Sequence, residues 1–289
     1  MCKTSYRPMI IREVEIAVIS DLHLATHACK PKKIIRYLKS IQPKMLVLNG
    51  DIIDSWRFSR NYFPKNHLKV IRQMIKMMEK GVEVYYITGN HDEFLRKISH
   101  VKIGNLNIVN QLVLDLEGKK TWIFHGDVFD PSIHRTKWLA KFGAAVYGFL
   151  AMFNKLINRF LHWIGKPEII IYKSLKKRLS SEKLNLSKFE TTVANSAISQ
   201  GYQNVICGHT HIPKEKRALI NGELIHYINC GDWVEHFTAA EYYNGDWNLF
   251  YYKEDVEEIP LQDELDFPVK HQLYQSILRE LAYSNVLPQ

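Results

Sequence analysis

The chain has 289 residues, of which 46% are hydrophobic and 24% are charged, and this ordinary globular composition argues against a disordered protein. Its 39 Lys and Arg residues exceed its 30 Asp and Glu residues, and the resulting net charge of +9 favours an anionic partner such as a phosphorylated substrate, a nucleic acid or an acidic membrane surface. The four cysteines lack CxxC spacing, which argues against a zinc knuckle or a redox pair. Residues 1–12 contain no apolar segment typical of a secretory signal, so a cytoplasmic location is expected.

The first ninety residues alternate short apolar runs with amphipathic segments. The runs at residues 14–20, 45–49 and 82–88 predict buried strands. The segments at residues 31–40 and 65–80 carry apolar side chains on one face and predict helices. Strands joined through helices over short links predict a parallel sheet with right-handed crossovers.

From residue 107 onwards the pattern is rich in strands. Residues 107–115 and 121–125 predict a hairpin about Gly118, and further strands are expected at 204–207, 223–229, 236–243 and 247–252. A C-terminal helix is expected at 271–283. Residues from about 133 to 200 are almost wholly helical in pattern. We interpret them as a helical cap inserted into a single α/β domain that spans residues 1–289.

Polar motifs directly follow five of the predicted strands. Functional side chains of open α/β sheets collect just beyond the carboxyl ends of the strands, so we expect the five motifs to meet at one sheet edge. Carboxylates, an amide and imidazoles suit two divalent metals about 4 Å apart, which acidify a bridging water and clamp phosphoryl oxygens. Each motif alone can arise by chance. In chain order the motifs are Asp21-Leu22-His23, Gly50-Asp51-Ile52-Ile53-Asp54, Gly89-Asn90-His91-Asp92, His125-Gly126-Asp127 and Gly208-His209-Thr210-His211.

Together these motifs resemble the calcineurin-like metallophosphoesterase superfamily, whose consensus is DxH, GDxxD, GNH[DE], a later His and GHxH. The resemblance covers about residues 14–243 and implies a four-layer α/β/β/α sandwich. It implies that His91 is a catalytic group that donates a proton or hydrogen bond to the phosphoryl group, and that Asp54 orients His91. The alternative for Asp54 is an exposed carboxylate at a helix start. The resemblance further implies one metal held by Asp21, His23, Asp51 and His211, and a second held by Asp51, Asn90, His125 and His209, with Asp51 bridging.

The cap contributes a narrower resemblance. Residues 138–163 combine apolar faces and aromatic side chains with a following basic run at 173–178, which suits a helix at an anionic membrane interface or, alternatively, an internal hairpin packed on the sandwich. Together with residues 89–95, 125–127, 208–211 and 230–234, the inserted cap makes the chain resemble the UDP-2,3-diacylglucosamine diphosphatase group. That resemblance implies cleavage of a UDP-linked diacylglucosamine to UMP and a lipid phosphate in the lipid A pathway, by attack of a metal-bridging hydroxide. It also implies manganese as the metal, and a cytoplasmic protein that is peripheral on the inner membrane.

One position departs from that group and keeps other functions open. Its members commonly carry Arg directly after the Asn ligand, where this chain has His91. A pyrophosphate leaves as a weakly basic phosphate monoester, whereas an alkoxide needs a general acid. The alternative is therefore a soluble phosphodiesterase or phosphatase of broader specificity with His91 as general acid. A nucleic-acid partner is not expected, because no basic stripe is interleaved with aromatic residues, and a scaffold without catalysis is disfavoured because every ligand position is filled.

Overall fold

The computed structural model describes residues 11–56, 63–130, 188–220 and 222–253. The chain divides into two compact units, residues 1–126 with 196–289 and residues 127–195. The described part of the second unit comprises η2 (Asp127–Phe129) and most of helix α5 (Lys188–Ser199). Residues 133–187 of the predicted cap, including its basic run, and the whole predicted C-terminal helix lie outside the described residues, so both remain predictions.

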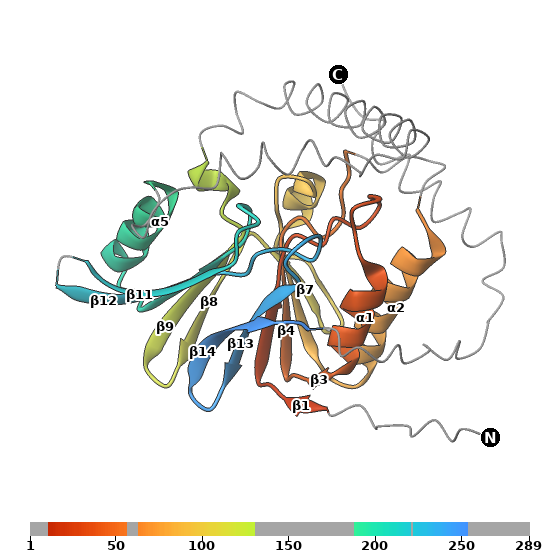
Figure 1. The fold of residues 1–289 in the computed structure, drawn as a ribbon, viewed down its shortest axis with the longest axis horizontal. Helices are drawn as coiled ribbons and strands as arrows, with labels where there is room; N and C mark the ends of the chain where they lie inside the picture. Colours follow the sequence, from red (N-terminus) through yellow and green to blue (C-terminus); the bar gives the residue numbers. More distant parts are fainter. Residues whose placement is uncertain (1–10, 57–62, 131–187, 221, 254–289) are drawn as a thin grey trace, which may run out of the picture. The chain divides into compact units, whose positions relative to one another are not determined.

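The larger sheet of the first unit contains the predicted parallel strands (Figure 1). The predictions at residues 14–20, 45–49 and 82–88 are confirmed, and all four residues of the first strand are buried, as expected for a strand covered on both faces. Antiparallel strands extend the sheet at both edges. In sheet order the strands are β14 (Asp246–Tyr251), β13 (Thr238–Tyr243), β2 (Ile16–Ile19), β4 (Met45–Asn49), β5 (Glu83–Ile87), β7 (Leu106–Val109) and β6 (Lys102–Ile103).

A five-stranded sheet forms the other half of the sandwich. The chain turns at Gly118 between two of its strands, so the predicted hairpin is confirmed. The edge strand β11 was not predicted, because its alternation of Lys, Glu and Arg with apolar residues lacks the buried run that marks a central strand. In sheet order the strands are β11 (Lys214–Ile220), β12 (Glu223–Asn229), β10 (Asn204–Cys207), β9 (Lys119–Phe124) and β8 (Gln111–Leu116).

The expectation of one continuous strand over residues 107–115 is wrong. The segment divides at Asn110, so that β7 belongs to the larger sheet and β8 to the smaller one. Thr88 fixes the chain where it passes from one sheet to the other. Its backbone N–H donates to the carbonyl of Val109, and its hydroxyl donates to the Asn110 side chain. Ile108 is buried under the helices, whereas Leu112 packs between the sheets. Apolar alternation runs through both halves, and the pattern therefore does not reveal the change of sheet.

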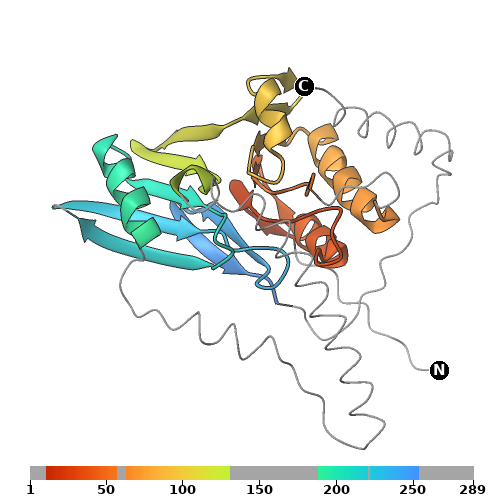
Figure 2. The same cartoon turned by 90° about the horizontal axis from the view of Figure 1, so that it is seen from above.

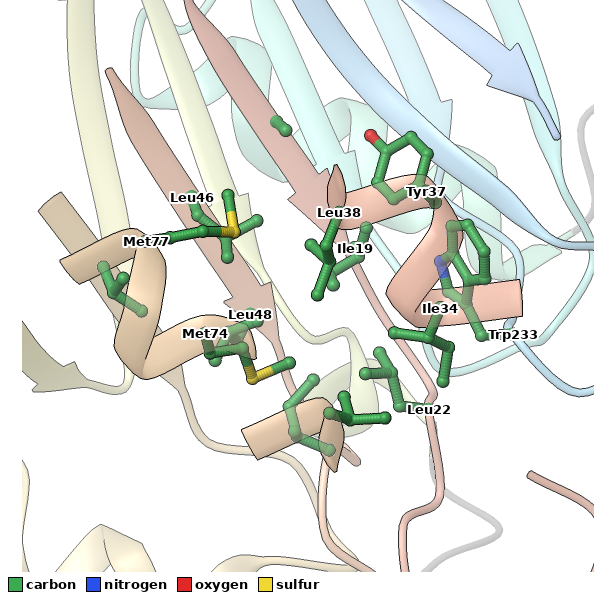
Figure 3. Packing of buried hydrophobic residues seen from close by; sticks show 14 of the residues in the cluster. Ile19, Leu22, Ile34, Tyr37, Leu38, Leu46, Leu48, Met74, Met77 and Trp233 are labelled. Atoms are coloured by element: carbon green, nitrogen blue, oxygen red, sulfur yellow. The ribbon is translucent and has the colours of Figure 1, made fainter. Parts of the chain in front are cut away.

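Two apolar layers hold the first unit together. Ile16, Val18 and Val47 of the larger sheet pack against Ile123 and Ile206 of the smaller one. On the opposite face of the larger sheet, side chains of α1 (Pro31–Lys39) and α2 (Lys65–Glu79) pack against side chains of β2 and β4, as Figure 3 shows. Figure 2 shows both helices on the side of the larger sheet that faces away from the smaller one. The predicted α/β sandwich is confirmed, and the bounds predicted for α1 and α2 lie within one residue of those observed.

A partly buried ion pair holds the start of the described chain against the sandwich. Arg12 lies in β1 (Arg12–Glu13), which pairs with β3 (Ile41–Gln42). Its guanidinium donates to both carboxylate oxygens of Glu241 on β13, at 2.6 and 2.9 Å. The Glu241 side chain is 1% exposed and also accepts a hydrogen bond of 3.0 Å from the Tyr37 hydroxyl. Burial, followed by the nearby Glu241 carboxylate, raises the pKa of Tyr37, which therefore stays a donor.

Candidate metal centre and active site

The predicted motifs converge in the first unit, but they come from both sheets. Three follow β2, β4 and β5 of the larger sheet, and two follow β9 and β10 of the smaller one. The expectation that all five share one sheet edge is therefore wrong. The parallel strands of both sheets end on the same side of the sandwich, and His125, just after β9, comes within 3.4 Å of Asp51, just after β4. The site is built across the two sheets.

Asp21, His23 and His211 form the first cluster. Nε2 of His211 lies 3.3 Å from Oδ1 of Asp21 and 3.3 Å from Nε2 of His23. Nε2 of His23 lies 3.9 Å from the same Asp21 oxygen. The backbone N–H of His209 donates to the other Asp21 oxygen at 3.0 Å, which fixes the carboxylate. Two imidazole nitrogens and one carboxylate oxygen thus face a common point.

Asp51, His125 and His209 form the second cluster, with one ligand atom of each lying within 4.8 Å of the others. Nδ1 of His125 lies 2.9 Å from the Asn49 carbonyl, so Nδ1 carries the proton and Nε2 is left with a lone pair directed towards Asp51. Asn90 is buried, with its predicted ligand oxygen Oδ1 enclosed by protein. A carboxylate oxygen of Asp51 also lies within 4.8 Å of ring nitrogens of His23 and His91, so Asp51 is close to both clusters.

The backbone at the site adopts conformations that side chains rarely tolerate. Five of the predicted ligand residues have a positive φ: 54° at Asp21, 48° at His23, 54° at Asp51, 66° at His209 and 61° at His211. Non-glycine residues in such regions cost on the order of 1–3 kcal/mol each and persist where the surrounding structure and a function require them. Five of the seven predicted ligand residues are strained in this way, which marks the region as a functional site.

Two glycines make room for the carboxylates. A Cβ atom at Gly89 would overlap the Asp51 side chain, and a Cβ at Gly208 would overlap the side chains of Ser20 and Asp21. The Ser20 hydroxyl in turn donates to Asp21 Oδ2 at 2.5 Å. Glycine in the GNH and GHxH motifs therefore serves close approach of the neighbouring strand end.

His91 and Asp54 lie beside both clusters. Nδ1 of His91 is 3.2 Å from Oδ2 of Asp54, and Nε2 of His91 is 3.9 Å from Oδ2 of Asp51. Asp54 is 4% exposed, so its interpretation as an exposed helix-start carboxylate is wrong. Burial opposes ionisation of Asp54, yet the imidazoles of His23 and His91 hold its pKa below the ordinary value. Burial also lowers the pKa of His91, but Asp54 and Asp51 outweigh it and raise that pKa. His91 can therefore carry a transferable proton.

Two further carboxylates organise the loops, and Asp232 was assigned no site role from the sequence. Asp92 is fully buried and accepts hydrogen bonds from the backbone N–H groups of Gly89 and Ile52 and from the Tyr86 hydroxyl. It thereby joins the loops after β4 and β5. Asp232 lies in the loop after β12 and approaches His211. Because β12 runs parallel to β10, the strand-end argument applied to the other motifs points to Asp232 as well.

The clustered side chains fit divalent cations. Within the described part of the chain, Oδ1 of Asp21 and Oδ1 of Asn90 accept no hydrogen bond, although both oxygens are buried. Buried polar atoms are rarely left in this state, and a cation bound here would supply the missing partner. Carboxylate and amide oxygens together with neutral imidazoles are ligands that manganese, iron, zinc and cobalt accept.

The fold and this site define a metal-dependent phosphohydrolase. The family model described as Calcineurin-like phosphoesterase matches residues 14–213, and the chain belongs to that family. A UDP-2,3-diacylglucosamine hydrolase of Aliivibrio fischeri is 27% identical over 237 residues, which cover 78% of this chain and 94% of that protein. A protein of the same name from Neisseria meningitidis is 27% identical over 252 residues, which cover 80% of this chain and 95% of that protein. Among solved structures, a novel archaeal phosphodiesterase is 15% identical with a TM-score of 0.39, over 82% of this chain and 99% of the other.

In the described ranges, no helix combines the length and the apolar character that crossing a bilayer requires.

Proposed function

We propose that the chain binds two divalent ions, most readily manganese, with the ligand set predicted from the motifs. Asp21, His23, Asp51 and His211 would hold one ion, and Asp51, Asn90, His125 and His209 the other. Such a pair, when bound, acidifies a water and neutralises phosphoryl charge. Two observations support this assignment: the two clusters themselves, and the position of Asp51, which lies 3.4 Å from His125 of the second cluster and within 4.8 Å of His23 of the first.

The protein's own residues then have distinct tasks. Asn49 fixes the proton of His125 on Nδ1, and Asp54 orients His91 through Nδ1. The Nε2 atom of His91 is left on the side of Asp51, where it can donate a proton or a hydrogen bond to a phosphoryl or leaving oxygen. The Trp56 ring lies against His91, with centroids 4.0 Å apart, and limits rotation of the imidazole.

The substrate we propose is a UDP-linked diacylglucosamine, cleaved to UMP and a lipid phosphate at the cytoplasmic face of a membrane. The observation that carries this proposal is the match to proteins named UDP-2,3-diacylglucosamine hydrolase over about four-fifths of the chain. The strand-end Asp and His clusters supply the hydrolytic chemistry that the reaction needs. A membrane surface as partner follows from the lipid-linked substrate.

A second function is favoured by the geometry of His91. An imidazole held by a buried carboxylate and facing the bridging Asp51 is the arrangement of a general acid, which an alkoxide leaving group requires and a phosphate leaving group does not. The alternative is therefore a phosphodiesterase or phosphatase of broader specificity.

The two functions separate in a substrate panel assayed with manganese. We expect UDP-diacylglucosamine to give the highest kcat/KM, with a cyclic nucleotide far slower. We expect His91→Arg to retain turnover of UDP-diacylglucosamine, because a fixed cation suffices there. In the alternative, the cyclic nucleotide is the better substrate, and both His91→Arg and His91→Ala slow its hydrolysis by about 100-fold.

An aryl ester provides the internal control for this panel. Bis-p-nitrophenyl phosphate releases a weakly basic phenolate, and a residue that acts only as general acid is dispensable for it. Equal losses for the cyclic nucleotide and the aryl ester in His91→Ala would contradict the role of proton donor. Loss of bound manganese in that variant would contradict the placement of His91 outside the ligand set.

Metal binding should also release protons. Burial lowers the pKa of His211, but Asp21 and Asp232 outweigh it and raise the pKa to about 8 in the metal-free protein. A protonated imidazole cannot be a ligand, so the apparent affinity for manganese should fall as the pH drops below about 8 and level off above it. Calorimetric titrations in buffers with different heats of ionisation measure the released protons. The absence of proton release near neutral pH would contradict the proposed coupling between deprotonation of His211 and metal binding.

A further inference from the structure

Asp232 is a buried carboxylate outside the proposed ligand set. It is 3% exposed and lies in the segment at 230–234 that follows β12. The backbone N–H groups of Glu235 and His236 donate to its Oδ1 at 2.9 and 2.8 Å. The loop is tied to the first ligand motif by Trp233, whose backbone N–H donates to the carbonyl of Asp21 at 3.2 Å. The orientation of the Asp232 carboxylate is therefore fixed by the chain itself.

The second oxygen of Asp232 meets His211. Oδ2 of Asp232 lies 3.0 Å from Nδ1 of His211. An ionised carboxylate only accepts hydrogen bonds, so the proton of a neutral His211 must reside on Nδ1. Nε2 then keeps its lone pair, and this atom is the one that lies 3.3 Å from Asp21 and 3.3 Å from His23.

We infer that Asp232 is a positioning residue that selects the metal-binding tautomer of His211 and aims its Nε2 at the first cation. Partners of this kind orient metal-bound histidines and raise their basicity. Only one part of this inference rests on the proposed function, namely that Nε2 of His211 binds a metal ion. The tautomer itself is a property of the metal-free protein.

The test uses Asp232→Asn in the full chain. The two backbone N–H donors retain the amide oxygen, so the amide NH2 faces Nδ1 of His211. Two donors cannot face each other, and the proton of His211 is therefore forced onto Nε2, where it blocks a cation. We expect manganese affinity, measured by calorimetry, to fall about 10–100-fold for the ion bound through His211. The melting temperature of the metal-free protein should stay near that of the wild type, because the side chain keeps its shape.

Two measurements distinguish positioning from a structural role. In a double-mutant cycle with His211→Ala, Asp232→Asn should have no further effect on manganese affinity, whereas a structural role would add its own loss. Nitrogen NMR of the wild-type ring, above the pKa of His211, should show the proton on Nδ1. A wild-type proton on Nε2, or additive losses in the cycle, would overturn the inference even if the variant folds poorly.

Asp246→Asn is the matched control, because Asp246 pairs with Arg217 at the surface and has no contact with the site. It should leave manganese affinity unchanged. If the wild type binds no manganese at all, the proposed ligand set fails, while the NMR experiment still decides the tautomer. If the wild type binds manganese and Asp232→Asn binds it equally well, the role of Asp232 fails and the ligand set stands.

Discussion

Asp51→Asn should abolish metal-dependent hydrolysis while leaving the fold intact. Asp51 contacts His91 and His125 and is the proposed bridge between two ions. Asn has no second anionic oxygen, so both ions lose their shared ligand. Charge stabilisation by such ions is worth several kcal/mol, and we expect kcat/KM to fall about a thousandfold or more. Activity with manganese and metal content after dialysis are the measurements.

The choice of Asn makes this prediction specific. Asn retains the oxygen that accepts the hydrogen bond of 2.8 Å from the backbone of His91, and it tolerates the positive φ of 54° at this position. The metal-free melting temperature should therefore change little. Manganese should raise the melting temperature of the wild type but not of Asp51→Asn, because only a bound ligand stabilises the folded state. Undiminished stabilisation by manganese in the variant would refute the bridging role.

Arg12→Ala should lower the stability of the fold strongly while leaving the metal site untouched. It leaves the Glu241 carboxylate, 1% exposed, without its cation and removes the stacking of the guanidinium on Phe250 at 3.9 Å. Breaking one side of a buried pair costs about 3–5 kcal/mol. For a chain of this size, the melting temperature should fall by roughly 10 °C. Chemical denaturation of the metal-free protein measures the effect.

Two variants test whether the unpaired charge is the cause. Adding Glu241→Gln to Arg12→Ala removes that charge, and the Tyr37 hydroxyl can still donate to the Gln oxygen, so part of the lost stability should return. Arg217→Ala breaks the exposed pair with Asp246 and should cost no more than about 1 kcal/mol. Equal losses for Arg12→Ala and Arg217→Ala would show that Glu241 remains solvated.

Local pattern predicted most elements of the described chain. The strand at Met45–Asn49 has both of its predicted ends, because a short buried apolar run defines it locally. The helix α1 begins at Pro31 as predicted, because Pro is favoured in the first turn of a helix. Edge strand β11 and the break at Asn110 were not predicted. Both depend on which sheet a strand joins, and that is decided by distant partners.

The sequence by itself determined the chemistry of the site: Asp, Asn and His residues, each next to glycine or at a strand end, in an order that points to metal-dependent phosphate hydrolysis. Only the tertiary structure decided that the two sheets share the site, that Asp54 is buried against His91, and that Asp232 holds His211. Residue types and local spacing are encoded along the chain. Distances such as the 3.0 Å between Asp232 and His211, 21 residues apart, arise only when the strands pack and their ends meet.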